Sequence, residues 1–160
     1  MDGRRLILRQ ILSETTLRKL QLIEHLDLLT NPIEEEQLAA ELVVSKRTLK
    51  NDIQQINNNF DFLHIHNTCQ GIYLTYAEGK NYRAIYRYFL KHELGFRLLD
   101  YIFRESNVTL EQVAKELYTS PSTIYRLVNK LNQALEFYHI KICYPSLTFD
   151  GEEVDIRFFF

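Results

Sequence analysis

Two clusters of basic and polar side chains recur in this chain of 160 residues. The first contains Lys46, Arg47 and Lys50, and the second contains Arg126 and Lys130. A hydroxyl, that of Thr48, stands between the cations of the first cluster and an amide, that of Asn129, between those of the second, and neither cluster contains an acid. Cations of this kind bind phosphate oxygens, while amides and hydroxyls can also bind base edges. These residue types therefore favour recognition of a nucleic acid, although the formal net charge of the chain is only -2.

Both clusters lie within an internal repeat. Shifting the sequence by 75 positions aligns 37–65 with 112–140 without a gap and gives ten identities, where ordinary amino-acid usage gives about two. The identical pairs include Ser45 and Ser120, Asn57 and Asn132, and His64 and His139. We expect the two copies to share one fold and the two histidines to share a structural role.

The second copy predicts two consecutive helices. Thr109 and Gln112 have the spacing of a capping box, so a short helix begins near Leu110. Ser120 is a good N-cap and Pro121 suits the first position of a longer helix. A short helix, a tight turn and a longer amphipathic helix form a helix-turn-helix, whose second helix can enter the major groove of DNA.

The first copy has the same elements, a short helix over 34–42 and a longer helix from Lys46 to about Asn59. Apolar residues at helical spacing point inward, which leaves a polar face outside. The candidate DNA-binding residues on the outward faces are Lys46, Arg47, Thr48, Lys50, Asn51 and Gln54 in the first copy, and Ser122, Thr123, Tyr125, Arg126, Asn129 and Lys130 in the second. The acids at 34–36 are expected to stabilise a helix N-terminus, away from the groove-facing helix.

The turn between the two helices is unusual in both copies. It contains Val43 in the first copy and Tyr118 in the second, where a helix-turn-helix often has Gly or Asn. A bulky residue makes a left-handed backbone conformation costly. We therefore expect the turn angle to differ from that of the simplest repressors.

The remaining segments complete the predicted architecture. Alternating residues at 63–76 and 140–150 predict β-hairpin wings, and helical segments at 16–29 and 82–104 would close each three-helix core. The predicted fold class is mainly α with small β-hairpin wings, in two tandem winged helix-turn-helix domains. The predicted boundaries are 1–78 for the first domain, 79–105 for a helical linker and the first helix of the second domain, and 106–160 for the second winged helix-turn-helix and the start of a following helix.

Several classes of protein are disfavoured by composition. Apolar runs are far shorter than the roughly 18 residues of a membrane span, and the distant Cys69 and Cys143 fit a reducing compartment, so we expect a cytoplasmic protein without disulfides. His64 and His66 share one strand face but lack a third ligand, so no metal site is expected. Because there is no phosphate-binding Gly-rich loop and no nucleophile elbow, we expect neither an enzyme nor a cofactor.

The second copy also carries a family resemblance. The segment 116–132, E-L-Y-T-S-P-S-T-I-Y-R-L-V-N-K-L-N, followed by I-K-I and then L-T-F-D-G-E-E-V-D-I-R-F-F, resembles the Mga/AtxA-type transcriptional regulators of Gram-positive bacteria. The resemblance covers essentially the whole chain and is strongest from about 109 to 160. It implies a transcription regulator whose two N-terminal helix-turn-helix domains bind DNA, often an activator of virulence or sugar-uptake genes.

Two hypotheses about partners follow. The first is double-stranded DNA, with RNA polymerase and a second copy of the protein as further partners; a homodimer would form through parts outside this chain, which we expect to be the N-terminal fragment of a longer protein. The second is that one or both winged helices act as protein-interaction or oligomerisation modules without contacting DNA. The two copies need not contribute equally, because the first has the more basic helix.

Overall fold

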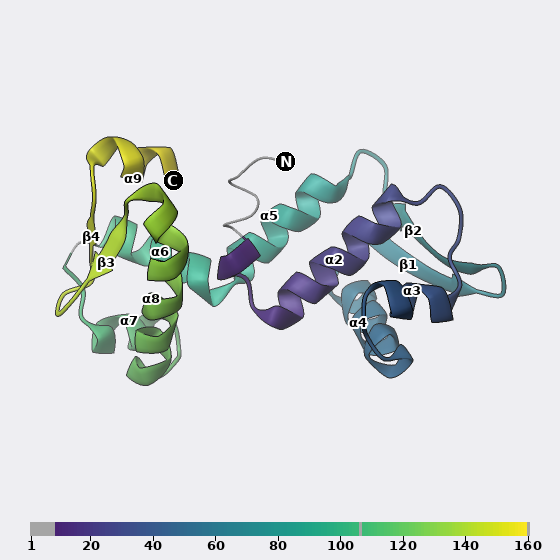
Figure 1. Cartoon of the computed structure of the whole chain (residues 1–160), viewed down its shortest axis with the longest axis horizontal. Helices are drawn as coiled ribbons and strands as arrows, with labels where there is room; N and C mark the ends of the chain where they lie inside the picture. Colours follow the sequence, from purple (N-terminus) through teal and green to yellow (C-terminus); the bar gives the residue numbers. More distant parts are fainter. Residues whose placement is uncertain (1–8, 106, 160) are drawn as a thin grey trace. The chain divides into compact units, whose positions relative to one another are not determined.

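The computed structural model describes residues 9–105 and 107–159 (Figure 1). They form two compact units, a first unit of residues 14–89 and a second unit of residues 9–13 together with 90–159. Each unit is mainly helical and contains one antiparallel two-stranded hairpin. The predicted fold class, mainly α with small β-hairpins, is confirmed to that extent. Within the described ranges, no helix combines the length and the apolar character that a membrane crossing needs.

The first unit places three helices ahead of its hairpin. Its elements in chain order are α2 (Glu14–Leu28), α3 (Glu35–Glu41), α4 (Lys46–Asn59), β1 (Leu63–Thr68), β2 (Gly71–Tyr76) and most of α5 (Tyr82–His92). Apolar side chains of α2, α3, α4 and the hairpin are buried together. Phe60, directly after α4, meets α5 through the rings of Tyr88 and Phe89, with centroids 4.6 and 5.5 Å away.

The second unit repeats this order. Its elements are α6 (Leu94–Arg104), α7 (Leu110–Glu116), α8 (Pro121–Leu135), the short 3-10 helix η1 (Glu136–Tyr138), β3 (Lys141–Cys143), β4 (Thr148–Asp150) and α9 (Glu153–Phe159). One apolar core runs through α6, α7, α8 and the hairpin. Backbone bridges join Ile33 to Ile72 and Val108 to Leu147, so both hairpins are tied in the same way to the residues ahead of the short helix.

Helix starts follow the sequence signals. The Thr109 hydroxyl accepts a hydrogen bond from the Gln112 backbone N–H at 3.3 Å, and Gln112 Oε1 accepts one from the Thr109 N–H at 2.8 Å. Ser120 Oγ accepts from the Thr123 N–H at 3.2 Å, with Pro121 at the first helical position. The predicted capping box and N-cap are confirmed, and so are the starts of α7 and α8.

The helical segment expected over 82–104 is two helices. Glu93 has an extended backbone (φ -71°, ψ 132°) and separates α5 from α6. Its carboxylate accepts hydrogen bonds from the Ser13 N–H at 3.0 Å and the Ser13 hydroxyl at 2.8 Å. Gly95 lets Ile11 approach, since a Cβ at that position would lie 2.6 Å from Ile11 Cγ2. Contacts with residues far earlier in the chain therefore accompany the break, and local sequence could not reveal them.

The turns adopt the conformation that the sequence argument disfavoured. Val43 and Tyr118 both have φ of 55°, in the left-handed region. In each turn two consecutive backbone N–H groups donate hydrogen bonds to carbonyls of the short helix. In the first unit these bonds run from Val43 to Ala40 (3.1 Å) and from Val44 to Ala39 (2.9 Å). This is a Schellman motif, which requires a left-handed residue after the helix. Satisfying the helix-end carbonyls outweighs the steric cost of a bulky side chain.

An identical asparagine ties the long helix to the wing in each unit. The Asn57 side chain donates to the Ile65 carbonyl at 2.9 Å and accepts from the Ile65 N–H at 2.8 Å. Asn132 makes the same two bonds to Ile142, at 3.0 and 2.8 Å. The identity of these asparagines in the repeat therefore has a structural reason.

The shared role expected for the two histidines is wrong. His64 lies in strand β1, whereas His139 has φ of 57° and ends η1, ahead of β3. Because η1 adds two residues to the second copy, the partner of Ile65 is Ile142 and not the aligned Ile140. The ungapped sequence alignment is thus out of register after the long helix.

Candidate nucleic-acid interface

Helix α4 has a buried apolar face and an exposed polar face. Leu49, Ile53 and Ile56 are buried in the core of the first unit. Of the predicted site residues on α4, Thr48 is half-buried and the others are exposed: Lys46, Arg47, Lys50, Asn51 and Gln54. The helix can therefore present five of the six side chains to a ligand.

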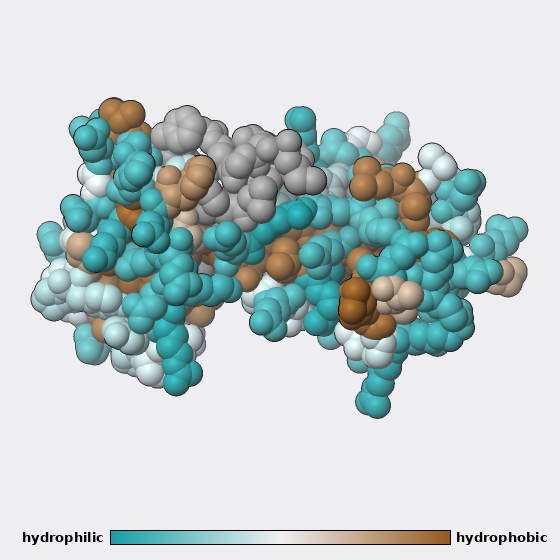
Figure 2. All heavy atoms as spheres, in the orientation of Figure 1, coloured by the Kyte–Doolittle hydropathy of each residue, from teal (hydrophilic) through white to brown (hydrophobic). Residues whose placement is uncertain are grey.

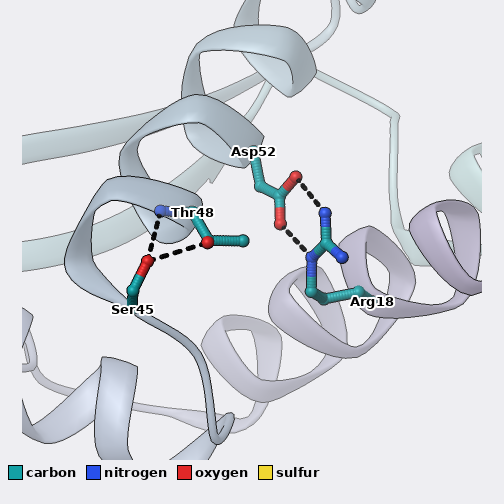
Figure 3. Close-up of polar contacts among 4 residues, drawn as sticks. All are labelled: Arg18, Ser45, Thr48 and Asp52. Carbon is teal, nitrogen blue, oxygen red and sulfur yellow. Dashed lines mark hydrogen bonds and ion pairs between the residues drawn. The ribbon is translucent and has the colours of Figure 1, made fainter.

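The acid of α4 is turned inward and neutralised. Asp52 is 3% exposed, and its two oxygens accept hydrogen bonds from Arg18 of α2, from Nε at 2.6 Å and from Nη2 at 3.0 Å (Figure 3). The hydrogen bond to Asp52 raises the pKa of the Arg18 guanidinium above its ordinary value. The carboxylate thus does not repel an anion on the outer face of α4.

The start of α4 is held by its N-cap. Ser45 Oγ accepts a hydrogen bond from the Thr48 N–H at 3.1 Å and lies 2.8 Å from the Thr48 hydroxyl (Figure 3). Thr48 therefore serves the cap, which explains its partial burial. This contact fixes where the outward face of α4 begins.

The acids of α3 lie beside α4, contrary to expectation. Glu36 forms an ion pair with Lys46, and Glu35 Oε1 lies 3.3 Å from Lys50 Nζ. The hydrogen bond between Lys46 and Glu36 lowers the pKa of the Glu36 carboxyl and raises that of the Lys46 ammonium. The prediction failed because it considered only the dipole of α3 and not the proximity of α3 to the first turns of α4. Among the described residues, Arg47 takes part in no ion pair.

Helix α8 of the second unit exposes all six of its predicted site residues. Ser122 and Thr123 have hydroxyls 2.9 and 2.8 Å from Ser120 Oγ, so both belong to the N-cap. The Lys130 ammonium donates to the backbone carbonyl of Leu12 at 3.0 Å. Arg126 and Asn129 are exposed on the same helix. Both cations of α8, Arg126 and Lys130, are thus exposed, and Lys130 also has a hydrogen-bond partner within its own unit.

The wings contribute residues that sequence reasoning missed. An open groove between α4 and β1 is lined by Lys50, Gln54, His64 and Asn67, among others. In the second unit, Tyr144 beyond β3 lies over α8, with its ring centroid 5.5 Å from that of Tyr125. Burial and the neighbouring Tyr125 raise the pKa of Tyr144. The alternation that predicted each wing gave no sign of which side chains would face the helix.

The remaining polar residues form no metal site that can be recognised. His66 stacks on Tyr73 with centroids 4.7 Å apart and lies 4.6 Å from the ring of His64. Over 9–105 and 107–159, no three His, Cys, Asp or Glu side chains come together as a metal site would require. Cys69 and Cys143 are both free thiols.

Known proteins are similar to this chain in sequence. The Mga helix-turn-helix domain is the family whose model matches residues 78–160, more than half of the chain. The chain belongs to this family. A "Putative trans-acting regulator" of Streptococcus pneumoniae serotype 4 (strain ATCC BAA-334 / TIGR4) is 28% identical over 154 residues, which are 96% of this chain and 31% of that protein. The chain therefore spans about a third of the length of this relative.

Two solved structures resemble the chain weakly. ScpB from Mycobacterium tuberculosis has a TM-score of 0.35 at 15% identity, over 91% of this chain and 96% of ScpB. A conserved hypothetical protein from Chlorobium tepidum has a TM-score of 0.31 at 16% identity, over 98% of this chain and 97% of that protein. At these TM-scores neither likeness supports a conclusion about fold or function.

Proposed function

We propose that this chain is the DNA-binding region of a bacterial transcription regulator and that it recognises double-stranded DNA through two tandem winged helix-turn-helix domains. In this proposal the first domain ends at 78, residues 79–105 link it to the second and supply that domain's first helix, and the second winged helix-turn-helix covers 106–160. The observation that carries the proposal is the outer face of α4, where Arg47, Asn51 and Gln54 are exposed while the acid of the helix is buried against Arg18.

The side chains have distinct roles in this proposal. Arg47 and Arg126 bind phosphates or the O6 and N7 atoms of guanine, and Asn51 and Gln54 bind adenine edges in the major groove. The wings lie along the flanking backbone. Asn129 extends the reading face of α8 in the second unit.

The wider role is inferred from the family and from the regulator that the chain resembles. We propose a binding rather than a catalytic role, in the bacterial cytoplasm, as an activator of virulence or sugar-uptake genes. RNA polymerase and a second copy of the whole protein are the proposed protein partners. The similarity to the protein named "Putative trans-acting regulator" supports the regulatory part of this role.

Separate substitutions in the two helices test the proposal. Arg47→Ala with Lys50→Ala, and Arg126→Ala alone, are compared with the unchanged chain by fluorescence anisotropy on promoter and scrambled duplexes across a salt series. Each lost phosphate contact should flatten the slope of log affinity against log salt by about 0.9, and each lost base contact should lower discrimination between duplexes. Unchanged affinity in one variant would remove that helix from the interface.

One observation favours the alternative of a protein-interaction module. Three of the five candidate cations already have partners within the chain. Lys46 and Lys50 form ion pairs with carboxylates, and Lys130 donates a hydrogen bond to a backbone carbonyl. A chain that stays monomeric and retards no promoter duplex at low salt would support this alternative for one or both units. Retardation that is lost in the Arg47 variant would reject it for the first unit.

A further inference from the structure

Two carboxylates occupy the same surface as the lysines of α4. Glu36 is paired with Lys46, and Glu35 Oε1 lies 3.3 Å from Lys50 Nζ. The side chains of Lys46 and Lys50 are nevertheless 51% and 61% exposed, so a ligand approaching α4 can reach both ammonium groups. The lysines are therefore accessible, and each already has an anionic partner.

A carboxylate offers an ammonium group the same chemistry that a phosphate oxygen does. The Glu36 carboxyl has a lowered pKa and the Lys46 ammonium a raised one, each because of the hydrogen bond between them, so this pair is fully ionised at neutral pH. A phosphate that binds Lys46 has two possibilities. Either the Glu36 carboxylate moves away from the ammonium group, or the phosphate lies close to this carboxylate. Like charges at that distance repel each other. The two glutamates therefore oppose phosphate binding at α4.

The second unit does not have this arrangement. The positions that match Glu35 and Glu36 in the repeat are Leu110 and Glu111, and those that match the two lysines are Pro121 and Tyr125. Glu111 thus has no lysine at the matching positions of α8. The competing carboxylates are a property of the first unit and not a requirement of the helix-turn-helix.

We infer that Glu35 and Glu36 limit the affinity for DNA, because they compete with DNA phosphates for Lys46 and Lys50 and so weaken binding to every duplex sequence by the same factor. This inference rests on the proposed function. With the general phosphate attraction reduced, binding depends more strongly on base-edge contacts by Asn51 and Gln54. Phosphate contacts contribute affinity without sequence information, so weakening them leaves the ratio of specific to non-specific affinity unchanged but lowers the fraction of the protein that is held on non-specific DNA.

The test uses the full chain and charge-neutral, isosteric substitutions. Glu35→Gln with Glu36→Gln removes both competitors, and Glu111→Gln is the matched control, because it removes one negative charge from the corresponding helix of the second unit. Affinities are measured by fluorescence anisotropy across a salt series on two duplexes. One duplex is selected from a random pool by the unchanged chain, and the other is a scrambled sequence of the same composition.

The expected result is stronger binding of the scrambled duplex, roughly tenfold at about 0.2 M salt, and a log–log salt slope that is steeper by up to about 1.8, if both lysines gain a phosphate. Affinity for the selected duplex should rise by about the same factor, so that discrimination between the two duplexes stays level. Glu111→Gln should change either affinity less than threefold, roughly the effect expected of one exposed charge.

A second set of variants keeps the general charge effect separate. When Lys46→Gln and Lys50→Gln are already present, adding Glu35→Gln and Glu36→Gln should change the affinity little further. The lysines for which the carboxylates and the phosphates compete are then absent. An effect of the glutamates that persists without the lysines, or one equal to that of Glu111→Gln, would overturn the inference.

If the unchanged chain and every glutamate variant fail to bind either duplex at low salt, the proposed function falls together with the inference. If Arg47→Ala weakens binding while the glutamate variants bind as the unchanged chain does, only the inference falls.

Discussion

The two units contain the same order of helices and strands but stabilise it with different side chains. In the first unit Arg18 of α2 makes a bidentate ion pair with the buried Asp52 of α4. The residue that matches Asp52 in the repeat is Leu127 of α8, which is half-buried and packs against the core of the second unit, as Leu94 of α6 also does. A half-buried leucine thus stands where the first unit has the buried carboxylate of an ion pair. This comparison indicates that the fold requires a filled position there and does not require charge.

The features that the two units share are hydrogen bonds to backbone groups. Each has a Schellman turn, a serine N-cap and an asparagine that binds the wing strand through two hydrogen bonds. All three satisfy backbone groups that would otherwise lack partners. The units differ in the length of the hairpin, in the presence of η1 and in the charge of side chains on their helices.

The largest expected effect comes from breaking the ion pair of the first unit. Asp52→Ala leaves Arg18 without its partner in a partly buried site, and we expect a loss of about 2–3 kcal/mol in the free energy of unfolding of the first unit. This is less than for a fully buried pair, because the Arg18 side chain is 33% exposed. Amide hydrogen exchange of α2 and α4, followed by mass spectrometry, measures the loss within the first unit alone.

The double substitution Arg18→Leu with Asp52→Leu converts the first unit to the chemistry of the second. Because no charge is left unpaired, its stability should lie within about 1 kcal/mol of the unchanged chain. A double variant as unstable as Asp52→Ala would show that the ion pair does more than fill the position. The protection of α6 and α8 should stay unchanged in both variants and serves as the internal control.

The second expected effect tests a feature that the units share. Asn57→Ala and Asn132→Ala each remove two hydrogen bonds and leave the N–H of Ile65 or Ile142 without its partner, which should cost about 1–2 kcal/mol in the corresponding unit. Hydrogen exchange at the affected hairpin measures the loss, and the hairpin of the other unit is the control. Similar costs would support equivalent roles. A large difference would show that the shorter hairpin of the second unit depends on its asparagine to a different extent.

Local signals in the sequence located the helices, but contacts distant in the sequence set the charge of the surface. Thr109 and Ser120 fixed the starts of α7 and α8, because caps act within four residues. The pairing of Glu36 with Lys46 depends on how α3 packs against α4, and the bond from Lys130 to Leu12 joins residues 118 positions apart. Neither follows from spacing. The outward faces were thus predictable as polar, whereas the share of their charge that is free to bind an anion was not.

The smallest expected effect concerns the turns. A hydrophobic patch lies over the region where α3 meets α4 (Figure 2), and Val43 in this turn is 90% exposed. Tyr118 is 93% exposed in the second unit. Neither side chain has packing to lose, and a left-handed backbone costs a non-glycine residue roughly 1–2 kcal/mol. Each substitution to Gly should therefore raise the stability of its own unit, by about 1 kcal/mol after the extra flexibility of glycine in the unfolded chain is included.

The gain should be larger for Val43→Gly than for Tyr118→Gly, because a β-branched residue is the more strained of the two in this region. Val43→Ala is the control. It removes exposed apolar surface but keeps the Cβ, so it should recover little of the strain. If Val43→Ala stabilises the first unit as much as Val43→Gly does, exposure rather than backbone strain is the source of the gain. If neither glycine variant is stabilised in hydrogen exchange, the hydrogen bonds of the Schellman turn hold the left-handed residue without measurable cost, and both units tolerate bulky side chains there equally.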